Sequence, residues 1–158
     1  MELQKALEIA TEIVGLVKPF CKPGFIEIAG SIRRKRPEVH DIDIVLIPAD
    51  PWNLSQVITA MKEKSGPAGA KIERFGYKGI DVDLYYATSS TWATLLLIRT
   101  GSKENNIRLA SLAKSKGWYL KANGQGLFDD QGKRLAGDTE QSVYEALGEP
   151  YQEPEERG

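Results

Sequence analysis

The chain has 158 residues, a length that fits one compact domain or a catalytic subdomain with a small companion. Its hydrophobic content of 41% and charged content of 27% are ordinary for a globular protein, and no apolar stretch approaches the roughly 20 residues of a membrane span. The formal net charge of −1 does not indicate a nucleic-acid partner by itself, but basic residues gather between Arg99 and Lys121 and acidic ones after Asp138.

The N-terminus and the cysteine content indicate the compartment. Residues 1–5 contain no apolar core of a signal peptide, and a single cysteine, Cys21, forms no internal disulfide. We therefore expect an intracellular, cytoplasmic protein without membrane association. No exposed apolar stripe stands out, so we expect a monomer.

In the first half of the chain, the spacing of the apolar residues changes between two patterns. Steps of three and four residues predict amphipathic helices, and runs rich in β-branched residues predict strands. Glycine and proline pairs predict turns and loops. In chain order, the expected elements are a helix over residues 3–17, a turn at 23–24, strands over 25–29 and 41–47, a helix over 53–64, a loop over 66–69 and a strand over 80–86.

The second half is predicted to be smaller and mainly helical. One helix is expected over 92–98, and another begins after Ser102, a good N-cap, and ends near Gly117. Two short strands and a last helix follow, over 118–120, 126–128 and 139–147. We predict an α+β fold in which a small mixed or antiparallel sheet with flanking helices is followed by a small helical part with a β-hairpin.

Three aspartates suggest metal chemistry. Asp41 and Asp43 lie two residues apart on a predicted strand, so their side chains leave the same face. Asp83, two residues after Asp81, supplies a third carboxylate if the two strands are neighbours. Such carboxylates repel one another unless a cation lies between them, and Mg²⁺ is the natural occupant. We interpret the set as ligands of two divalent ions for phosphoryl transfer, although Asp-x-Asp alone is more often an ordinary strand face.

A possible anion-binding motif precedes the aspartates. Gly30 and Ser31 end the predicted strand, and Arg33 and Arg34 follow. Glycine lets backbone amides approach an anion, and the serine hydroxyl and the arginines add donors. A Gly-Ser turn alone is a weak signal. Together with Asp-x-Asp beginning ten residues after the serine, it places triphosphate donors beside metal ligands, as nucleotidyl transfer requires.

With these motifs, the sequence resembles family X DNA polymerases, within the DNA polymerase beta-like nucleotidyltransferase superfamily. The resemblance implies a palm domain over residues 1–87, a C-terminal thumb subdomain that selects the nucleotide over residues 88–158, and no lyase domain before the palm. The residues that carry it are Gly30-Ser31-Ile32-Arg33-Arg34, Asp41-Ile42-Asp43, Val82-Asp83-Leu84, Arg99-Thr100-Gly101-Ser102 and the segment from Tyr144 to Arg157.

The resemblance implies a role for each matching residue. Asp41 and Asp43 resemble ligands shared by two Mg²⁺ ions, for which Mn²⁺ substitutes. Asp83 resembles the ligand of the catalytic ion that helps to deprotonate a primer 3′-hydroxyl. The implied nucleotide-binding residues are Gly30, Ser31, Arg34, Gly101 beside the sugar and Asn106 beside the incoming base. Next to such a site, we interpret the basic run as contacts to DNA phosphates, from Lys103, Arg108, Lys114 and Lys116.

The chain also departs from the family pattern. Ile98-Arg99 stands where members often carry Tyr-Phe or Gly-Trp, and Asp81 stands where some members have an arginine. We interpret the chain as a minimal DNA polymerase that adds nucleotides from dNTPs to a primer in primer-template or gapped DNA, in short-gap repair synthesis. Two alternatives stay open: a template-independent or small-acceptor nucleotidyltransferase, and a non-catalytic nucleic-acid-binding module.

Overall fold

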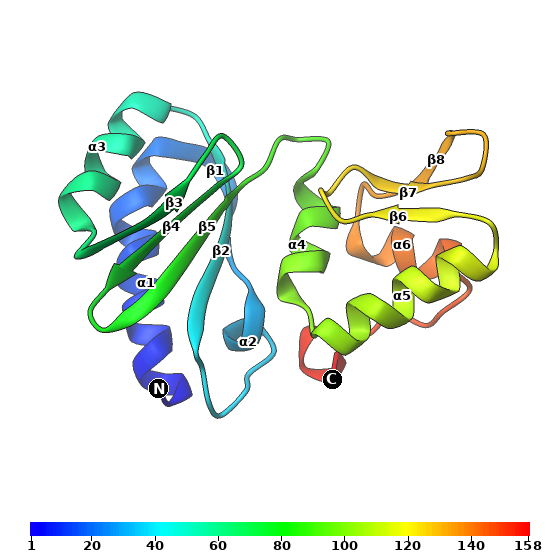
Figure 1. Cartoon of the computed structure of the whole chain (residues 1–158), viewed down its shortest axis with the longest axis horizontal. Helices are drawn as coiled ribbons and strands as arrows, with labels where there is room; N and C mark the ends of the chain where they lie inside the picture. The colour runs from blue at the N-terminus through cyan, green and yellow to red at the C-terminus, as the bar shows by residue number, and fades with distance from the viewer.

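The computed structural model describes residues 1–158, without the side chain of residue 67. The predicted α+β class is confirmed: a five-stranded sheet with helices is joined to a smaller unit of helices and three short strands (Figure 1). Among the described residues, no helix is both long enough and apolar enough to cross a membrane.

The helices and strands are, in chain order, α1 (Leu3–Val17), β1 (Cys21–Ile28), α2 (Gly30–Arg33), β2 (Asp41–Pro48), α3 (Pro51–Met61), β3 (Lys64–Ala68), β4 (Ile72–Tyr77), β5 (Ile80–Tyr86), α4 (Trp92–Thr100), α5 (Lys103–Ser115), β6 (Tyr119–Lys121), β7 (Gly126–Phe128), β8 (Arg134–Ala136) and α6 (Glu140–Ala146).

The larger sheet is mixed and has the order β1-β2-β5-β4-β3. β2 and β5 run parallel, whereas the other neighbouring pairs are antiparallel. The chain passes from β2 to β5 through α3, β3 and β4, which supplies the long connection that parallel neighbours require. The two strands that carry the aspartates are therefore neighbours, as the metal interpretation needed.

The side chains of β2 and β5 alternate between two environments. Ile44 and Leu84 are fully buried against α1 and α3, which cover one face of the sheet (Figure 1). Val45 and Tyr85 lie on the opposite face and pack against α4. Because side chains alternate with a period of two, Asp43 and the other aspartates of both strands share this second face. One face of the strand pair thus makes the core, and the other presents the acids.

The smaller unit has its own hydrophobic core. Leu97 of α4, Leu109 of α5, Leu127 of β7 and Tyr144 of α6 are buried together. α4 takes part in two cores, because Leu96 packs with the residues of the large sheet while Leu97 belongs to the second core. This helix therefore joins the two parts of the chain.

Several predictions about the strands were wrong. Pro23 and Gly24, expected to form a turn, lie within β1, and most of the expected loop over 66–69 lies within β3. β4 and β8 were not predicted. The expected hairpin is present as β6 and β7, and β8 adds a third antiparallel strand beside β7. β1 and β3 are the edge strands of their sheet, where proline and glycine are tolerated because one side of the strand needs no hydrogen-bond partner.

Replacing Ile44 by alanine is expected to lower the free energy of unfolding by roughly 2–5 kcal/mol, because the buried side chain leaves a cavity beneath the sheet. The matched variant Ile107→Ala, at a side chain that is 55% exposed, should change it by less than about 0.5 kcal/mol. Urea unfolding followed by circular dichroism measures both. Equal losses in the two variants would contradict the placement of Ile44 in the core.

Candidate active site

Two neighbouring strands carry the acidic residues of the site. In the parallel pair of β2 and β5, Asp41 is the Cα partner of Asp81. Asp43 is the partner of Asp83. Neighbouring strands lie about 4.8 Å apart, and partners in register leave the sheet on the same face. We call these four residues the acidic row.

The acidic row carries more negative charge than its surroundings compensate. Burial, and after it the charges of Asp41 and Asp83, raise the pKa of Asp43 to about 7. Burial also raises the pKa of Asp83, against the effect of Arg74, whose Nε lies 3.4 Å from Asp83 Oδ1. The Tyr85 hydroxyl lies 3.4 Å from Asp43 Oδ1 and 3.3 Å from Asp83 Oδ2. A single hydroxyl proton cannot satisfy two carboxylates, so a bound cation would stabilise this arrangement.

The donor chemistry of the acidic row fits a hard divalent cation, because carboxylate oxygens are ligands that Mg²⁺ prefers. As the side chains lie, however, no three acidic, histidine or cysteine residues of the described part of the chain are grouped so that they could hold a metal ion. The prediction that carboxylates from two strands come together agrees with the strand register. Among these residues, no three side chains lie close enough together to bind one ion.

The Gly-Ser motif lies directly against Asp43. The Ala29 backbone N–H donates to the Asp43 carbonyl oxygen over 2.8 Å, and Gly30 has a φ of +61°. A side chain at position 30 would collide with the Asp43 carboxylate. Glycine is therefore required both by the left-handed backbone and by the close approach. Gly30 and Ser31 begin α2, one short helical turn, which follows the predicted strand directly.

Arg34 follows α2 and reaches the junction between α4 and α5. Its Nη1 donates to the Thr100 carbonyl oxygen over 2.8 Å, while its buried Nε finds no acceptor among the described residues. Burial, and after it the charge of Arg36, lower the pKa of Arg34. Gly101, with a φ of +71°, lies beside this guanidinium. An anion near Gly101 would lie beside a guanidinium that carries no carboxylate partner among the described residues.

A pocket of about 480 Å³ brings residues of both parts of the chain together. The predicted site residues that line it are Gly30, Ser31, Arg34, Asp41, Asp43, Gly101, Lys103 and Asn106. Asp83 lines a neighbouring pocket of about 400 Å³ together with Lys64 and Arg74. Asp41 lines both pockets, so the acidic row lies between them.

Not every predicted site residue faces these pockets. Arg108 pairs with Glu149 and donates to Gln152 Oε1 over 2.8 Å, contacts within the smaller unit. Lys114 is exposed on α5, and Lys116 Nζ lies 5.7 Å from the ring centroid of Trp118. Their contact with DNA stays a prediction.

Sequence reasoning missed three side chains of the site. Tyr85 could have been found, because it follows Asp83 by two residues and therefore shares its face. Arg99 places its Cζ 4.3 Å from the Tyr85 ring centroid, and Arg74 lies on β4. The sequence analysis named Arg99 only within the motif that carries the family resemblance and gave it no role beside the row, and Arg74 belongs to a strand that was not predicted. Packing decides that both arginines lie there.

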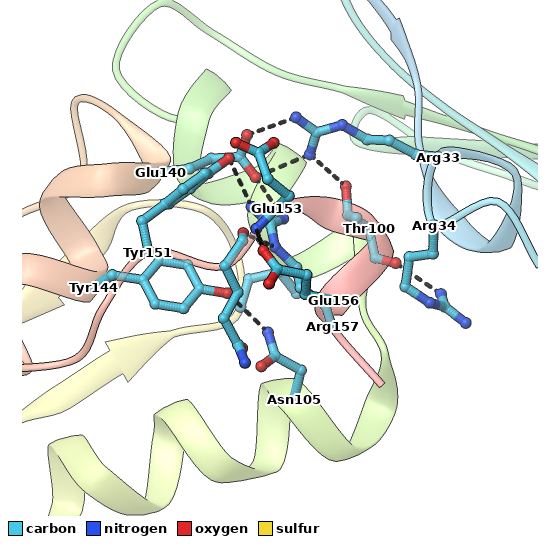
Figure 2. A network of polar contacts seen from close by, with 12 residues as sticks. Arg33, Arg34, Thr100, Asn105, Glu140, Tyr144, Tyr151, Glu153, Glu156 and Arg157 are labelled. Carbon is cyan, nitrogen blue, oxygen red and sulfur yellow. Dashed lines mark hydrogen bonds and ion pairs between the residues drawn. The ribbon is translucent and has the colours of Figure 1, made fainter.

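A buried charge network connects α2 to the smaller unit (Figure 2). Arg33 donates to both Glu140 oxygens, over 2.9 and 2.7 Å, and to Thr100 Oγ1 over 2.9 Å. The fully buried Arg157 donates to Glu140 Oε2 over 2.7 Å. Burial disfavours the charged form of Glu140, but hydrogen bonds and charges of Arg33 and Arg157 outweigh it and lower the pKa of Glu140. The network therefore positions the Gly-Ser motif relative to the α4–α5 junction.

Comparisons with known proteins point to one group of enzymes. Residues 95–158 match the family described as DNA polymerase beta thumb. DNA polymerase lambda of Rattus norvegicus is 26% identical over 184 aligned residues, which cover 95% of this chain and 32% of the relative. DNA polymerase/3′-5′ exonuclease PolX of Bacillus subtilis (strain 168) is 28% identical over 158 aligned residues, which cover 96% of this chain and 27% of the relative. The chain thus spans about a third or less of the length of these relatives.

Replacing Glu140 by glutamine is expected to lower the free energy of unfolding by roughly 3–5 kcal/mol at pH 7, because Arg33 and the buried Arg157 lose their anionic partner. The folded-state pKa of Glu140 is lowered, so its contribution is complete above the unfolded value near 4.5 and is lost as the pH falls through the folded value. Wild type and variant should therefore converge in stability on acidification. Urea unfolding between pH 7 and pH 3 measures this.

The control for this experiment is Glu155→Gln, because Glu155 pairs with Lys35 on the surface, where water screens the charges. This variant is expected to unfold like the wild type at every pH. A wild-type-like Glu140→Gln at pH 7 would contradict the network.

Proposed function

We propose that this chain, which is a relative of the family X DNA polymerases, transfers nucleoside monophosphates from nucleoside triphosphates to the 3′-hydroxyl of a DNA primer. The observation that carries the proposal is that Asp41 and Asp43 of the acidic row line one pocket together with Arg34. A polyanionic substrate accompanied by divalent cations is complementary to such a pocket. The names of both relatives, which are DNA polymerases, support a polymerase-related role.

In this proposal, Asp41, Asp43 and Asp83 would hold two Mg²⁺ ions, with Mn²⁺ as a substitute. When bound, such ions stabilise the charge on the attacking and leaving oxygens of phosphoryl transfer. Asp83 faces the neighbouring pocket with Lys64 and Arg74, so the primer end would enter from that side and Asp83 would accept a hydrogen bond from its 3′-hydroxyl. The two basic side chains there would face the primer phosphates.

The nucleotide would occupy the larger pocket. Ser31 and Arg34 would donate to the departing phosphates, and Gly30 and Gly101, which line the pocket without side chains, would let phosphate and sugar lie near the backbone. Asn106 donates its amide to the Ile98 carbonyl oxygen over 2.8 Å, and its buried Oδ1 has no partner among the described residues. Asn106 lines the pocket, and its side chain would lie beside the incoming base. Catalysis of this kind depends on positioning and charge rather than on covalent steps.

We propose residues 1–87 as the palm and residues 88–158 as the thumb, divided at the segment between β5 and α4. Lys103, which lines the pocket, and the exposed Lys114 and Lys116 would contact duplex phosphates, in short-gap repair synthesis. Arg108 would act there only through the part of its guanidinium that Glu149 leaves free.

Replacing Asp83 by alanine is expected to reduce primer extension by at least roughly a hundredfold, because even the partners of metal ligands contribute that much to metal-dependent activity. The fold should remain intact, since Asp83 lies outside the core clusters of the sheet. Extension of a labelled primer with Mg²⁺ and dNTPs measures activity, and circular dichroism measures folding. Extension at the wild-type rate would refute the assignment.

Primer-template, gapped and single-stranded DNA should be compared in that assay, with dNTPs and ribonucleotides in parallel. Extension that needs a template supports the polymerase. Extension of single strands alone would indicate the template-independent transferase, and DNA or nucleotide binding without pyrophosphate release would indicate the binding module.

Replacing Arg34 by glutamine is expected to raise the KM for the nucleoside triphosphate by about tenfold or more, because a hydrogen bond to a charged group contributes roughly 1.5–3 kcal/mol. Arg36→Gln is the matched control, since Arg36 lies two residues away and does not line the pocket. Steady-state kinetics at saturating primer measure both variants. A KM that changes equally in the two would count against direct contact between Arg34 and the triphosphate.

A further inference from the structure

Arg99 occupies an unusual place beside the acidic row. Its Cζ lies 4.3 Å from the ring centroid of Tyr85, and the hydroxyl of that ring faces Asp43 and Asp83. Its buried Nε has no acceptor among the described residues. A guanidinium over an aromatic face is attracted by the negative face of the ring.

The neighbouring residue keeps Arg99 in this position. Two arginines donate hydrogen bonds to Thr100. Arg33 donates to its hydroxyl over 2.9 Å, and Arg34 donates to its carbonyl oxygen over 2.8 Å. These contacts fix the end of α4 relative to α2, and from that backbone the side chain of Arg99 extends over the Tyr85 ring. Arg99 is therefore a positioned charge and not a free surface side chain.

The other arginines near the row have further partners. Arg34 lines the same pocket as Asp43, but its Nη1 donates to the Thr100 carbonyl oxygen. The charges of Arg33 and Arg157 are compensated by Glu140. Arg74 reaches Asp83, but its side chain is 50% exposed and water screens it. Arg99 lines the same pocket as Asp41 and Asp43.

We propose that Arg99, seated on Tyr85, is the internal counter-charge of the acidic row and competes there with a divalent cation. It thereby sets the cation concentration that the site requires. The inference rests on the proposed function, because it assumes that the row is a cation site. It also gives a reason why no three of the described acidic side chains are grouped around one point. Tyr85 and Arg74 contact the carboxylates until a bound cation takes over their role.

The test is Mn²⁺ binding to the full chain without DNA or nucleotide, measured from the electron paramagnetic resonance signal of free Mn²⁺. Arg99→Gln is expected to bind Mn²⁺ at least roughly fivefold more tightly than the wild type, which is the lower end of usual coupling between two sites. Arg99→Lys keeps the charge and should stay within about twofold of the wild type on the same scale. Lys133→Gln removes one exposed positive charge far from the row and should bind like the wild type.

Two further variants separate the possible outcomes. Arg99→Met keeps the aliphatic stem over Tyr85, and it replaces Arg99→Gln if thermal unfolding shows that the latter does not fold. Asp43→Asn should abolish the tight site in every background. Unchanged Mn²⁺ affinity in the neutral variants, with binding that still depends on Asp43, would overturn the role of Arg99 and leave the proposed function standing. Absence of Asp43-dependent binding from all variants would overturn both.

Discussion

The in-register parallel pairing of β2 with β5 is the constraint on which the site depends. It places Asp43 beside Asp83 on one face, and on the opposite face it buries Ile44 and Leu84 in the core. Apolar burial on one side therefore holds together strands whose acidic ends repel on the other. The hydroxyl of Tyr85 lies between two of the carboxylates and relieves only part of this repulsion. A site with residual negative charge is the natural result.

The second requirement is a fixed relation between the acidic strands and the smaller unit. α4 supplies it by packing, since its residues belong to two hydrophobic clusters. The network of Arg33, Glu140 and Arg157 fixes the relative orientation of the two parts. A bidentate guanidinium–carboxylate pair permits one orientation, whereas apolar packing permits several. Both act near Thr100, so the Gly-Ser motif and Gly101 meet at one pocket.

The match to known proteins and the geometry of the site support different parts of the proposal. The thumb family match begins at residue 95, within α4, and does not include the acidic row. The two relatives align with nearly the whole chain, at 26% and 28% identity. The chemistry of the first part therefore depends on strand register, burial and charge. At the position of Arg99, the polymerases that the sequence resembles often carry an aromatic residue, whereas here the arginine lies over the ring of Tyr85.

Local sequence patterns determined much of this protein. Alternation along residues 41–47 put Asp41 and Asp43 on one face, apolar spacing defined α1, and Ser102 caps α5 as its side chain predicted. These features depend on neighbours a few residues away, which a periodic pattern encodes. Only the tertiary structure decided that β5 lies beside β2, that β4 and β8 complete their sheets, and that Arg33 meets Glu140 107 residues later. Such contacts depend on how complete elements pack, and no local spacing specifies which distant strand or charge will be the partner.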